Sequence, residues 1–244
     1  MKKITFCFVI ILACAAPVFA GFNIETAAGY NYVSMSNLNR NIDAAFEQAK
    51  ADPDVLYASK QHVTDGWFVG IDGDYTFFPG LSAGPRVEYV GTFGAQITMR
   101  TTGFPITITA ATADLFAALI PVMAGVSYLY SVPGLPLSFG AEIYLGYGFA
   151  SLAVNTTMEN GFLAATTVES FEGSCFALES SFKISYSFNS TFSAGINAGY
   201  RSANVTKLKY TKVGLTLPNV SNFSENLQLD FSGMKLAAAA NFSF

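Results

Sequence analysis

Two-residue alternation of apolar and polar side chains constrains the fold of this chain more than any other feature of its sequence. From Phe22 to Tyr32 the even positions are mostly apolar or aromatic, whereas the odd positions are polar or small. Side chains alternate between the two faces of a β-strand, so such a segment has one apolar and one polar face. The pattern recurs and predicts eight strands, at residues 22–32, 67–77, 81–97, 115–130, 139–149, 175–188, 192–201 and 227–244.

Two of these segments need one further assumption each. Residues 115–130 are apolar on both faces, so we choose the parity that keeps their aromatic residues together on the outward face. This choice turns three large side chains inward, namely Leu115, Leu119 and Met123. In the last segment an odd outward set (Leu227, Leu229, Phe231) gives way to an even set after Ser232-Gly233. A parity change beside a glycine predicts a β-bulge.

Composition decides what the apolar faces contact. Aromatic residues make up 15% of the chain and charged residues only 12%, against roughly a quarter charged in ordinary soluble domains. After residue 20 no apolar stretch reaches the ~18 residues of a membrane helix, and the net charge of −4 argues against nucleic acid as a partner. The apolar faces carry more aromatic residues than two sheets of a sandwich would pack. A barrel with its apolar face in lipid fits better, and it must be closed because open strand edges do not occur in hydrocarbon.

The aromatic residues of the apolar faces fall into two groups by depth. Trp67 and Tyr75 mark the two groups on one strand, and at ~3.3 Å per residue and ~40° tilt they differ in height by roughly 20 Å. Aliphatic residues and alanine lie between them. Two aromatic girdles about 25 Å apart are typical of outer-membrane barrels. One predicted girdle contains Tyr30, Tyr32, Trp67, Phe93, Phe116, Phe149, Phe176, Tyr200 and Phe231.

The connections between the predicted strands are short at one end and long at the other. Phe78-Pro79-Gly80, residues 131–136 and Asn189-Ser190 form the short turns. The long connections are about residues 34–65, 98–114, 154–172 and 204–226, which we expect to be external loops. In the first of these, Leu38, Ile42, Phe46 and Ala49 have helical spacing before Asp52-Pro53. A short helix there would cap the barrel mouth or lie on the membrane surface, and a mobile loop is the alternative.

The first twenty residues have the pattern of a secretory signal peptide. Lys2 and Lys3 precede the apolar run of residues 4–16, and Val18-Phe19-Ala20 resembles a cleavage site. We therefore expect residues 1–20 to be the signal peptide and residues 21–244 to be one barrel domain. The alternatives are an uncleaved membrane anchor and lipid attachment at Cys14. Cleavage would leave Cys175 as the only cysteine, without an intrachain disulfide.

These features together resemble the small eight-stranded outer-membrane barrels of the OmpA transmembrane-domain and OmpX type. The resemblance covers residues 22–244 and rests on the leader, the strands, the loop asymmetry and the terminal Asn241-Phe242-Ser243-Phe244. It implies an all-β, eight-stranded antiparallel up-and-down transmembrane barrel in the bacterial outer membrane. It also implies that the barrel-assembly machinery recognises Ala240, Phe242 and Phe244.

Charged side chains of the strands fall on the polar face, which we expect to line the barrel interior. Eight strands leave an interior that side chains nearly fill, and unpaired buried charges are costly. We therefore expect a salt-bridged plug, with a narrow ion path as the alternative. The predicted interior charges are Glu25, Asp72, Asp74, Arg86, Glu88, Glu142, Glu179, Lys183, Arg201, Asp230 and Lys235.

Catalytic and metal chemistry have little support in the sequence. His62 is the only histidine, and Ser59 and Asp65 are its nearest candidate partners for nucleophilic catalysis. With no matching motif and no metal-ligand spacing, we expect no enzymatic activity, cofactor or metal.

The expected function is structural or adhesive, carried by external loops that contact an extracellular ligand or surface. A narrow porin-like channel and a barrel that handles lipid or small apolar ligands are the alternatives. The inward Leu119 and Met123, with Pro85 and Pro121 in the wall, are the features behind the second alternative. Outer-membrane lipid and the barrel-assembly machinery are the expected partners, and we expect a monomer.

Overall fold

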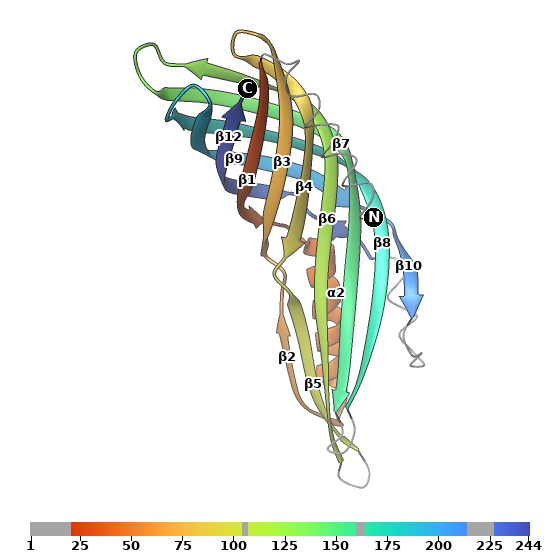
Figure 1. The fold of residues 1–244 in the computed structure, drawn as a ribbon. Coiled ribbons are helices and arrows are strands. Elements are labelled where there is room, and N and C mark those ends of the chain that lie inside the picture. Colours follow the sequence, from red (N-terminus) through yellow and green to blue (C-terminus); the bar gives the residue numbers. More distant parts are fainter. Residues whose placement is uncertain (1–20, 104–106, 160–163, 214–226) are drawn as a thin grey trace.

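A closed antiparallel barrel of eight strands forms the body of the molecule in the computed structural model (Figure 1), which describes residues 21–103, 107–159, 164–213 and 227–244. Each barrel strand pairs with the barrel strand that follows it in the chain, including β8 with β9. The first and last of them, β1 and β12, also pair and so close the barrel. This arrangement confirms the predicted fold class. The barrel strands are β1 (Phe22–Tyr32), β3 (Asp65–Phe78), β4 (Leu81–Thr92), β6 (Thr107–Ser131), β7 (Leu137–Glu159), β8 (Ala164–Ser187), β9 (Phe192–Val205) and β12 (Gly233–Ser243). The predicted signal peptide, residues 1–20, lies outside the described residues.

Short turns join the strands at one end of the barrel, which we call the turn end. Between β3 and β4, Gly80 has φ +78°, a left-handed conformation that glycine adopts without steric cost. The first and last described segments also meet at this end, because the Gly21 amide donates to the Phe244 carbonyl oxygen at 3.0 Å. The opposite end is the loop end.

The exterior of the barrel wall is apolar, with aromatic residues at both ends. Aliphatic side chains such as Ile71 and Leu145 are exposed between the two aromatic groups. At the loop end, eight of the nine predicted aromatic residues are exposed, and the exception is Phe231, which is fully buried. The exposed set is Tyr30, Tyr32, Trp67, Phe93, Phe116, Phe149, Phe176 and Tyr200.

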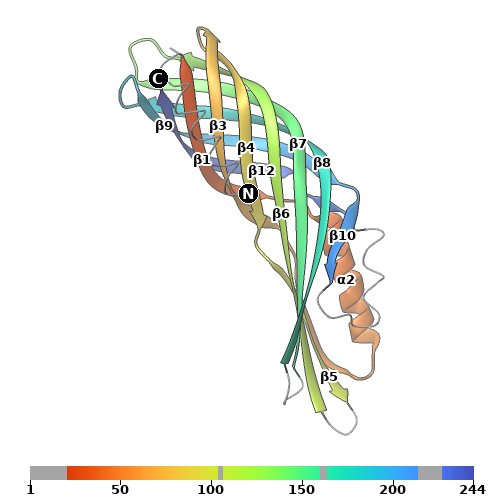
Figure 2. The same cartoon turned by 45° about the vertical axis from the view of Figure 1, so that its right-hand side comes forward.

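Strands β6, β7 and β8 continue past the loop end of the barrel and form a sheet that we call the extension (Figures 1 and 2). The expectation of long loops at residues 98–114 and 154–172 was therefore wrong. Thr98 pairs with Thr112, and Val154 pairs with Glu169, so both segments belong to hairpins. Their threonine and valine residues favour strands. The extension also contains β2 (Val55–Gln61), β5 (Ala95–Gly103) and β10 (Leu208–Val213).

Helix α2 (Ser36–Ala51) follows β1 and packs against β2 and β5 on the inner side of the extension (Figure 2). Its buried residues Leu38, Ile42 and Ala49 are three of the four that the helical spacing predicted, and the helix ends at Ala51, directly before Asp52-Pro53, as expected. Phe46 is half-buried, with the Lys60 ammonium 4.5 Å from the centre of its ring. Among the described residues, no helix has the length and apolarity needed to cross a membrane.

The predicted bulge in the last strand is absent. Leu229 of β11 (Leu229–Asp230) pairs with Val205, and Gly233 of β12 pairs with Arg201, so the register against β9 does not shift. Odd positions therefore face inward along the whole segment, and Leu227, Leu229 and Phe231 are buried rather than outward. They belong to the same apolar core as Leu38 and Ile42 of α2. These side chains therefore contact the interior of the protein, where we had expected them to contact lipid.

A one-residue shift of register occurs instead where the wall passes from β4 into β5. Gly91 of β4 pairs with Ala118, whereas Ala95 of β5 pairs with Leu115. The shift reverses the parity. Ala95 and Ile97 belong to the apolar alternation of the predicted strand 81–97, which would turn them outward, but they are buried on the inner side. It turns the apolar face of β5 towards the core of the extension.

Candidate functional site

A continuous network of charged side chains fills the barrel interior between the two ends. Nine of the eleven predicted interior charges are at most 8% exposed and are joined through ion pairs. They come from seven of the eight barrel strands, all except β6. We call this set the charged network: Glu25, Asp72, Arg86, Glu88, Glu142, Glu179, Lys183, Arg201 and Lys235.

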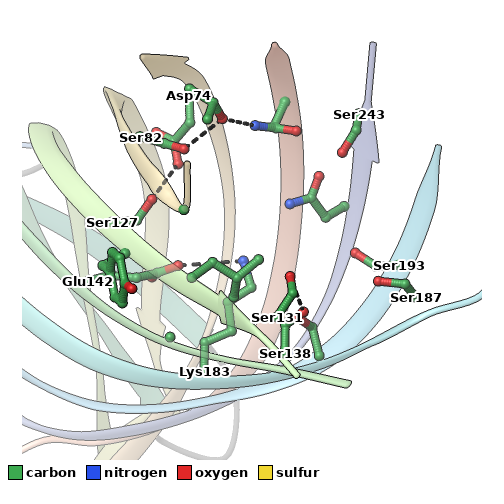
Figure 3. A pocket seen from close by; sticks show the side chains of 18 residues that line it. Asp74, Ser82, Ser127, Ser131, Ser138, Glu142, Lys183, Ser187, Ser193 and Ser243 are labelled. Atoms are coloured by element: carbon green, nitrogen blue, oxygen red, sulfur yellow. Dashed lines mark hydrogen bonds and ion pairs between the residues drawn. The ribbon is translucent and has the colours of Figure 1, made fainter. Parts of the chain in front are cut away.

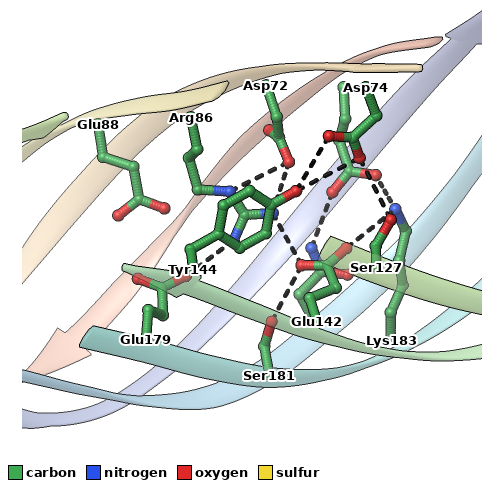
Figure 4. A network of polar contacts seen from close by, with 12 residues as sticks. Asp72, Asp74, Arg86, Glu88, Ser127, Glu142, Tyr144, Glu179, Ser181 and Lys183 are labelled. Atoms are coloured by element: carbon green, nitrogen blue, oxygen red, sulfur yellow. Dashed lines mark hydrogen bonds and ion pairs between the residues drawn. The ribbon is translucent and has the colours of Figure 1, made fainter. Parts of the chain in front are cut away.

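Arg86 is the centre of the charged network (Figure 4). Its Nη2 donates to Asp72 Oδ2 at 2.5 Å and to Glu142 Oε2 at 2.8 Å, and its Nη1 donates to Glu179 Oε1 at 2.8 Å. The guanidinium carbon lies 3.7 Å from the centre of the Tyr144 ring. One arginine thus ties β3, β7 and β8 to β4 across the interior. Charge-assisted hydrogen bonds of this kind are the stronger ones in proteins.

Lys183 and Glu25 form the part of the network nearest the turn end. The Lys183 ammonium donates to Glu25 and lies 3.5 Å from Glu142 Oε1. Asn197 donates from Nδ2 to Glu25 Oε1 at 2.9 Å, and Ser181 donates to Glu142 Oε2 at 3.0 Å. The pair joins β1 to β8, which do not hydrogen-bond to each other in the wall.

Arg201 and Lys235 form the part nearest the loop end, where they share two carboxylates. Arg201 Nη2 donates to Glu88 and to Glu179 Oε2, the latter at 2.8 Å. Lys235 donates to Glu88 Oε1 at 2.8 Å and also to Glu179. Its ammonium lies 4.5 Å from the centre of the Phe68 ring, so the polar network ends against an aromatic side chain.

Glycines leave the space that the large side chains of the network occupy. A Cβ at Gly125 would lie 2.6 Å from the Tyr144 ring, and a Cβ at Gly70 would lie 2.8 Å from Glu88 Cγ. Neither glycine has left-handed φ, so here the residue supplies room rather than backbone freedom. Tyr144, which the sequence analysis did not single out, lies on the same inward parity as Glu142.

Two of the predicted charges stand apart from the charged network. Asp74 is half-buried and accepts hydrogen bonds from Ser127 and Tyr144, without an ion pair in the described part of the chain. Asp230 faces away from the interior, and its carboxylate accepts from the Ser232 amide at 3.0 Å. The unbroken register of β11 and β12 places Asp230 on the opposite parity to Lys235, so its expected inward position was wrong.

Small polar side chains line a cavity of about 270 Å³ between the charged network and the turn end (Figure 3). Glu142 and Lys183 reach it from the charged network, and Asp74 also lines it. Most of the other residues are hydroxyl-bearing and come from strands all round the barrel, among them Thr76, Ser82, Ser127, Ser131, Ser138, Ser185, Ser187, Ser193 and Ser243.

Apolar side chains close the interior towards the loop end. Val33, Phe68, Val90, Leu119 and Phe231 are each at most 1% exposed and form one core. The buried face of α2 continues this core. The sequence predicted that three residues of one strand face inward and make that wall apolar. All three are buried, namely Leu115, Leu119 and Met123.

The wall between β4 and β6 contains an interruption at Pro121. Pairing passes from Val87 with Val122 to Val90 with Leu119 and skips the positions between them, where proline lacks an amide hydrogen. An exterior groove of about 250 Å³ lies over this place, lined by Tyr89, Ala118, Ile120, Phe149, Ala150, Ser151, Glu172 and Gly173.

The residues considered for catalysis are not brought together. His62 Nε2 lies 2.8 Å from Asp43 Oδ1 of α2, whereas Asp65 accepts a hydrogen bond from Tyr30. The ammonium of Lys60 binds the same Asp43 oxygen, and this hydrogen bond, followed by that of His62, holds the pKa of the Asp43 carboxyl below its ordinary value. The cluster fastens the helix to β2.

Carboxylate oxygens of Glu25, Asp72 and Glu142 lie within 4.8 Å of one another, which is close enough to share a cation. Lys183 and Arg86 already bind these three groups. Cys175 is buried and faces inward.

The terminal residues proposed as an assembly signal lie on the wall at the turn end. Phe242 and Phe244 are exposed on the exterior, and the Phe244 amide donates to the Phe22 carbonyl oxygen at 2.9 Å. Ala240 pairs with Thr26 of β1 and Ala194 of β9.

Comparison with known proteins gives structural likeness only. No family model matches the chain, and no curated protein sequence matches it. Among solved structures, the Neisserial surface protein A is 14% identical over 92% of this chain and 97% of its own, with a TM-score of 0.39. The attachment invasion locus protein Ail of Yersinia pestis is 11% identical over 90% and 98%, with a TM-score of 0.37. The outer membrane protein OprG from Pseudomonas aeruginosa is 14% identical over 93% and 97%, with a TM-score of 0.40.

Proposed function

We propose that this protein is a non-enzymatic barrel of the bacterial outer membrane that does not conduct ions and acts through the extension at its loop end. In this proposal the barrel is a closed anchor, exported and inserted from the periplasm. The turn end faces the periplasm, and the extension with α2 stands outside the cell. Its role is structural or adhesive, through contact with a ligand or another surface.

The observation that carries the proposal is the double closure of the interior. The charged network links strands on opposite sides of the barrel, so an ion on its way through would have to break several buried ion pairs. Beyond it, Phe68, Leu119 and Phe231 are at most 1% exposed and belong to one apolar core. Water and ions do not readily enter an apolar layer of this kind.

The exterior supports the membrane location. Exposed aliphatic side chains in a band between two groups of aromatic residues match the lipid-facing surface of outer-membrane barrels. The short turns at one end and the larger structure at the other match the periplasmic and external sides of such barrels. If the protein is inserted as such barrels are, its last strand carries the assembly signal. We therefore propose that Ala240, Phe242 and Phe244 form the segment that the barrel-assembly machinery binds.

Planar-bilayer conductance tests the proposal. Protein purified from membranes of cells that express the full chain is first shown to be folded by heat-modifiable gel mobility. We expect no reproducible current steps from the folded protein. Steps that disappear on heat unfolding would overturn the proposal in favour of a narrow channel, and failure to insert into lipid vesicles would overturn the membrane location.

The interruption at Pro121 favours a second candidate, a barrel that handles lipid or small apolar ligands. The exterior groove over the β4–β6 seam has the size of a small site and is lined partly by aromatic and aliphatic side chains. Replacement of Pro121 by Val would restore the missing amide donor. Lipid extracted from the wild-type protein, but not from this variant, would support the second candidate.

A further inference from the structure

The outer face of the extension carries an ordered row of hydroxyl groups. Thr98 pairs with Thr112, Thr112 with Thr157, and Thr157 with Thr166, so one threonine from each of four adjacent strands stands directly beside the next. The Oγ1 atoms of Thr157 and Thr166 are 3.3 Å apart, within hydrogen-bond distance. Neighbouring strands are ~4.8 Å apart, so the hydroxyls recur at that interval.

A second polar row runs beside the first, one step closer to the barrel. Gln96 pairs with Asp114, and Asp114 pairs with Asn155. Gln96 Nε2 donates to Asp114 Oδ1 at 2.9 Å. Neither row contains a basic residue, and Asp114 is the only charged member of the two.

These rows continue the exterior wall of the barrel. Thr112 has the same parity on β6 as the exposed Phe116, and Thr157 has the same parity on β7 as the exposed Phe149. The second row begins two residues past Phe116, which is about 7 Å along the strand. The same face of β6 and β7 is therefore apolar on the barrel wall, where we propose that it meets lipid, and presents hydroxyl, amide and carboxylate groups on the extension.

We propose that these two rows bind the sugar headgroups of glycolipids that surround the barrel. The inference rests on the proposed outer-membrane location. Hydroxyl and amide groups both donate and accept hydrogen bonds, as sugar hydroxyls do. Phosphate and other strongly anionic groups are instead bound by arginine and lysine, which are missing from the rows. Continuity with the lipid-facing wall is what assigns the sugar to neighbouring lipids rather than to a glycan from elsewhere.

The experiment compares two triple variants of the full chain, both made on the same three strands. Thr98→Val, Thr112→Val and Thr157→Val together remove outer hydroxyls while they keep the shape and strand preference of the side chains. Thr101→Val, Thr109→Val and Thr156→Val make the same change at the opposite parity, on the inner side. Binding of a fluorescently labelled lipopolysaccharide truncated to its core sugars is measured in mixed detergent micelles.

We expect the outer triple variant to bind the glycolipid about tenfold more weakly than wild type, because it loses three hydrogen-bonding groups. The inner triple variant should bind as wild type does. Added salt should change the affinity little, because the rows are almost uncharged. Equal weakening in both variants, no weakening in the outer variant, or loss of binding at high salt would each overturn the inference.

Two further measurements separate the possible causes of failure. The deacylated core oligosaccharide should bind more weakly than the intact glycolipid, because it lacks the membrane anchor that raises its effective concentration. Equal binding of the free oligosaccharide would overturn the assignment to surrounding lipid. Insertion into phosphatidylcholine vesicles without glycolipid tests the membrane location alone. A chain that inserts but ignores the glycolipid would refute only the inference about the rows.

Discussion

The barrel and the extension use the same strands with opposite polarity. Along β7, the inward side chains change from Glu142 and Tyr144 in the barrel to Leu152 in the extension. Its outward side chains change from Phe149 to Thr157 over the same boundary. The hydrogen-bond ladder with β6 and β8 runs through without a shift of register. The backbone pairing is therefore the same in both regions, and the change lies in the side chains. It matches the change of surroundings, since we assign lipid to the outside of the barrel and water to the outside of the extension.

This comparison shows how one sheet can belong to two kinds of core. In the barrel, the strands enclose buried charges and expose apolar side chains, as membrane barrels do. In the extension, they cover an apolar core and expose polar side chains, as soluble sheets do. The reversal lies at the aromatic residues of the loop end, so these mark the proposed membrane boundary.

Removal of Arg86 should have the largest effect on the barrel half. Arg86→Met would leave Asp72 without its ion pair and would remove one of the cationic partners of Glu142 and of Glu179. We expect this to lower the free energy of unfolding by roughly 3–5 kcal/mol. Urea unfolding in detergent micelles, followed by tyrosine and tryptophan fluorescence, measures this change. Arg100→Met, at an exposed position of the extension, should be nearly neutral. A cost below 1 kcal/mol, relative to the roughly 3–5 expected, would contradict the central role of Arg86.

Loss of a helix contact should instead affect the extension alone. Leu38 is fully buried in the core below α2, and Leu38→Ala should destabilise that core by roughly 2–5 kcal/mol. Hydrogen exchange should show lost protection in α2 and β2, whereas barrel amides keep theirs. The exposed position Gln48 provides a control, because Gln48→Ala should change neither region. Equal loss of protection in barrel strands would mean that the two cores unfold as one unit.

A charge placed on the outer face tests the reversal of polarity directly. Val122 and Thr112 share the outward parity of β6, the first on the barrel wall and the second on the extension. Val122→Arg should lower stability in lipid vesicles by roughly 2–4 kcal/mol, as expected near the middle of a bilayer. Thr112→Arg should change it little, since surface substitutions are usually within about 0.5 kcal/mol. Similar costs at both positions would place the membrane boundary elsewhere.

The smallest expected effect concerns the contact between α2 and β2. Lys60, and after it His62, lowers the pKa of the Asp43 carboxyl. A group with a lowered folded pKa contributes stability that is complete above its ordinary pKa and is lost as the pH falls through the folded value. Protection factors of α2 amides should therefore decrease in wild type as the pH falls below the ordinary pKa of an aspartate, about 3.9. Asp43→Asn should show no such step, and an identical step in that variant would assign it to another group.

Alternation along the chain was enough to predict the barrel but not the extension. The eight barrel strands, the nine charges of the network and the position of α2 follow from local pattern, because each side chain meets an environment of one clear polarity. The expectation for Leu227, Leu229 and Phe231 was wrong for a physical reason. Apolar side chains suit either lipid or a protein core, and only the tertiary structure shows which one they meet.

The extension was missed because its strands were judged by the polarity of the barrel. In the barrel the outward face of a strand is expected to meet lipid, so a polar residue at an outward position suggests that the strand has ended. Thr112 and Thr157 are such residues, and their segments were therefore predicted to be loops. The network was also predicted only as a set of charges. Its pattern of pairs, such as Glu25 with Lys183, 158 residues apart, depends on how the strands close into a circle.

The contacts of α2 with the end of the chain have a consequence for the order of folding. Asn37 donates to Gln228 at 2.6 Å, and the Met35 amide donates to the Asp230 carbonyl oxygen at 3.1 Å. Helix α2 leaves the ribosome early and therefore cannot complete its packing until the last strand has been delivered. Contacts of such long sequence separation form late and slowly. Until then α2 lacks the part of its apolar cover that Leu227, Leu229 and Phe231 supply, so an unfinished chain keeps this part of the helix surface open.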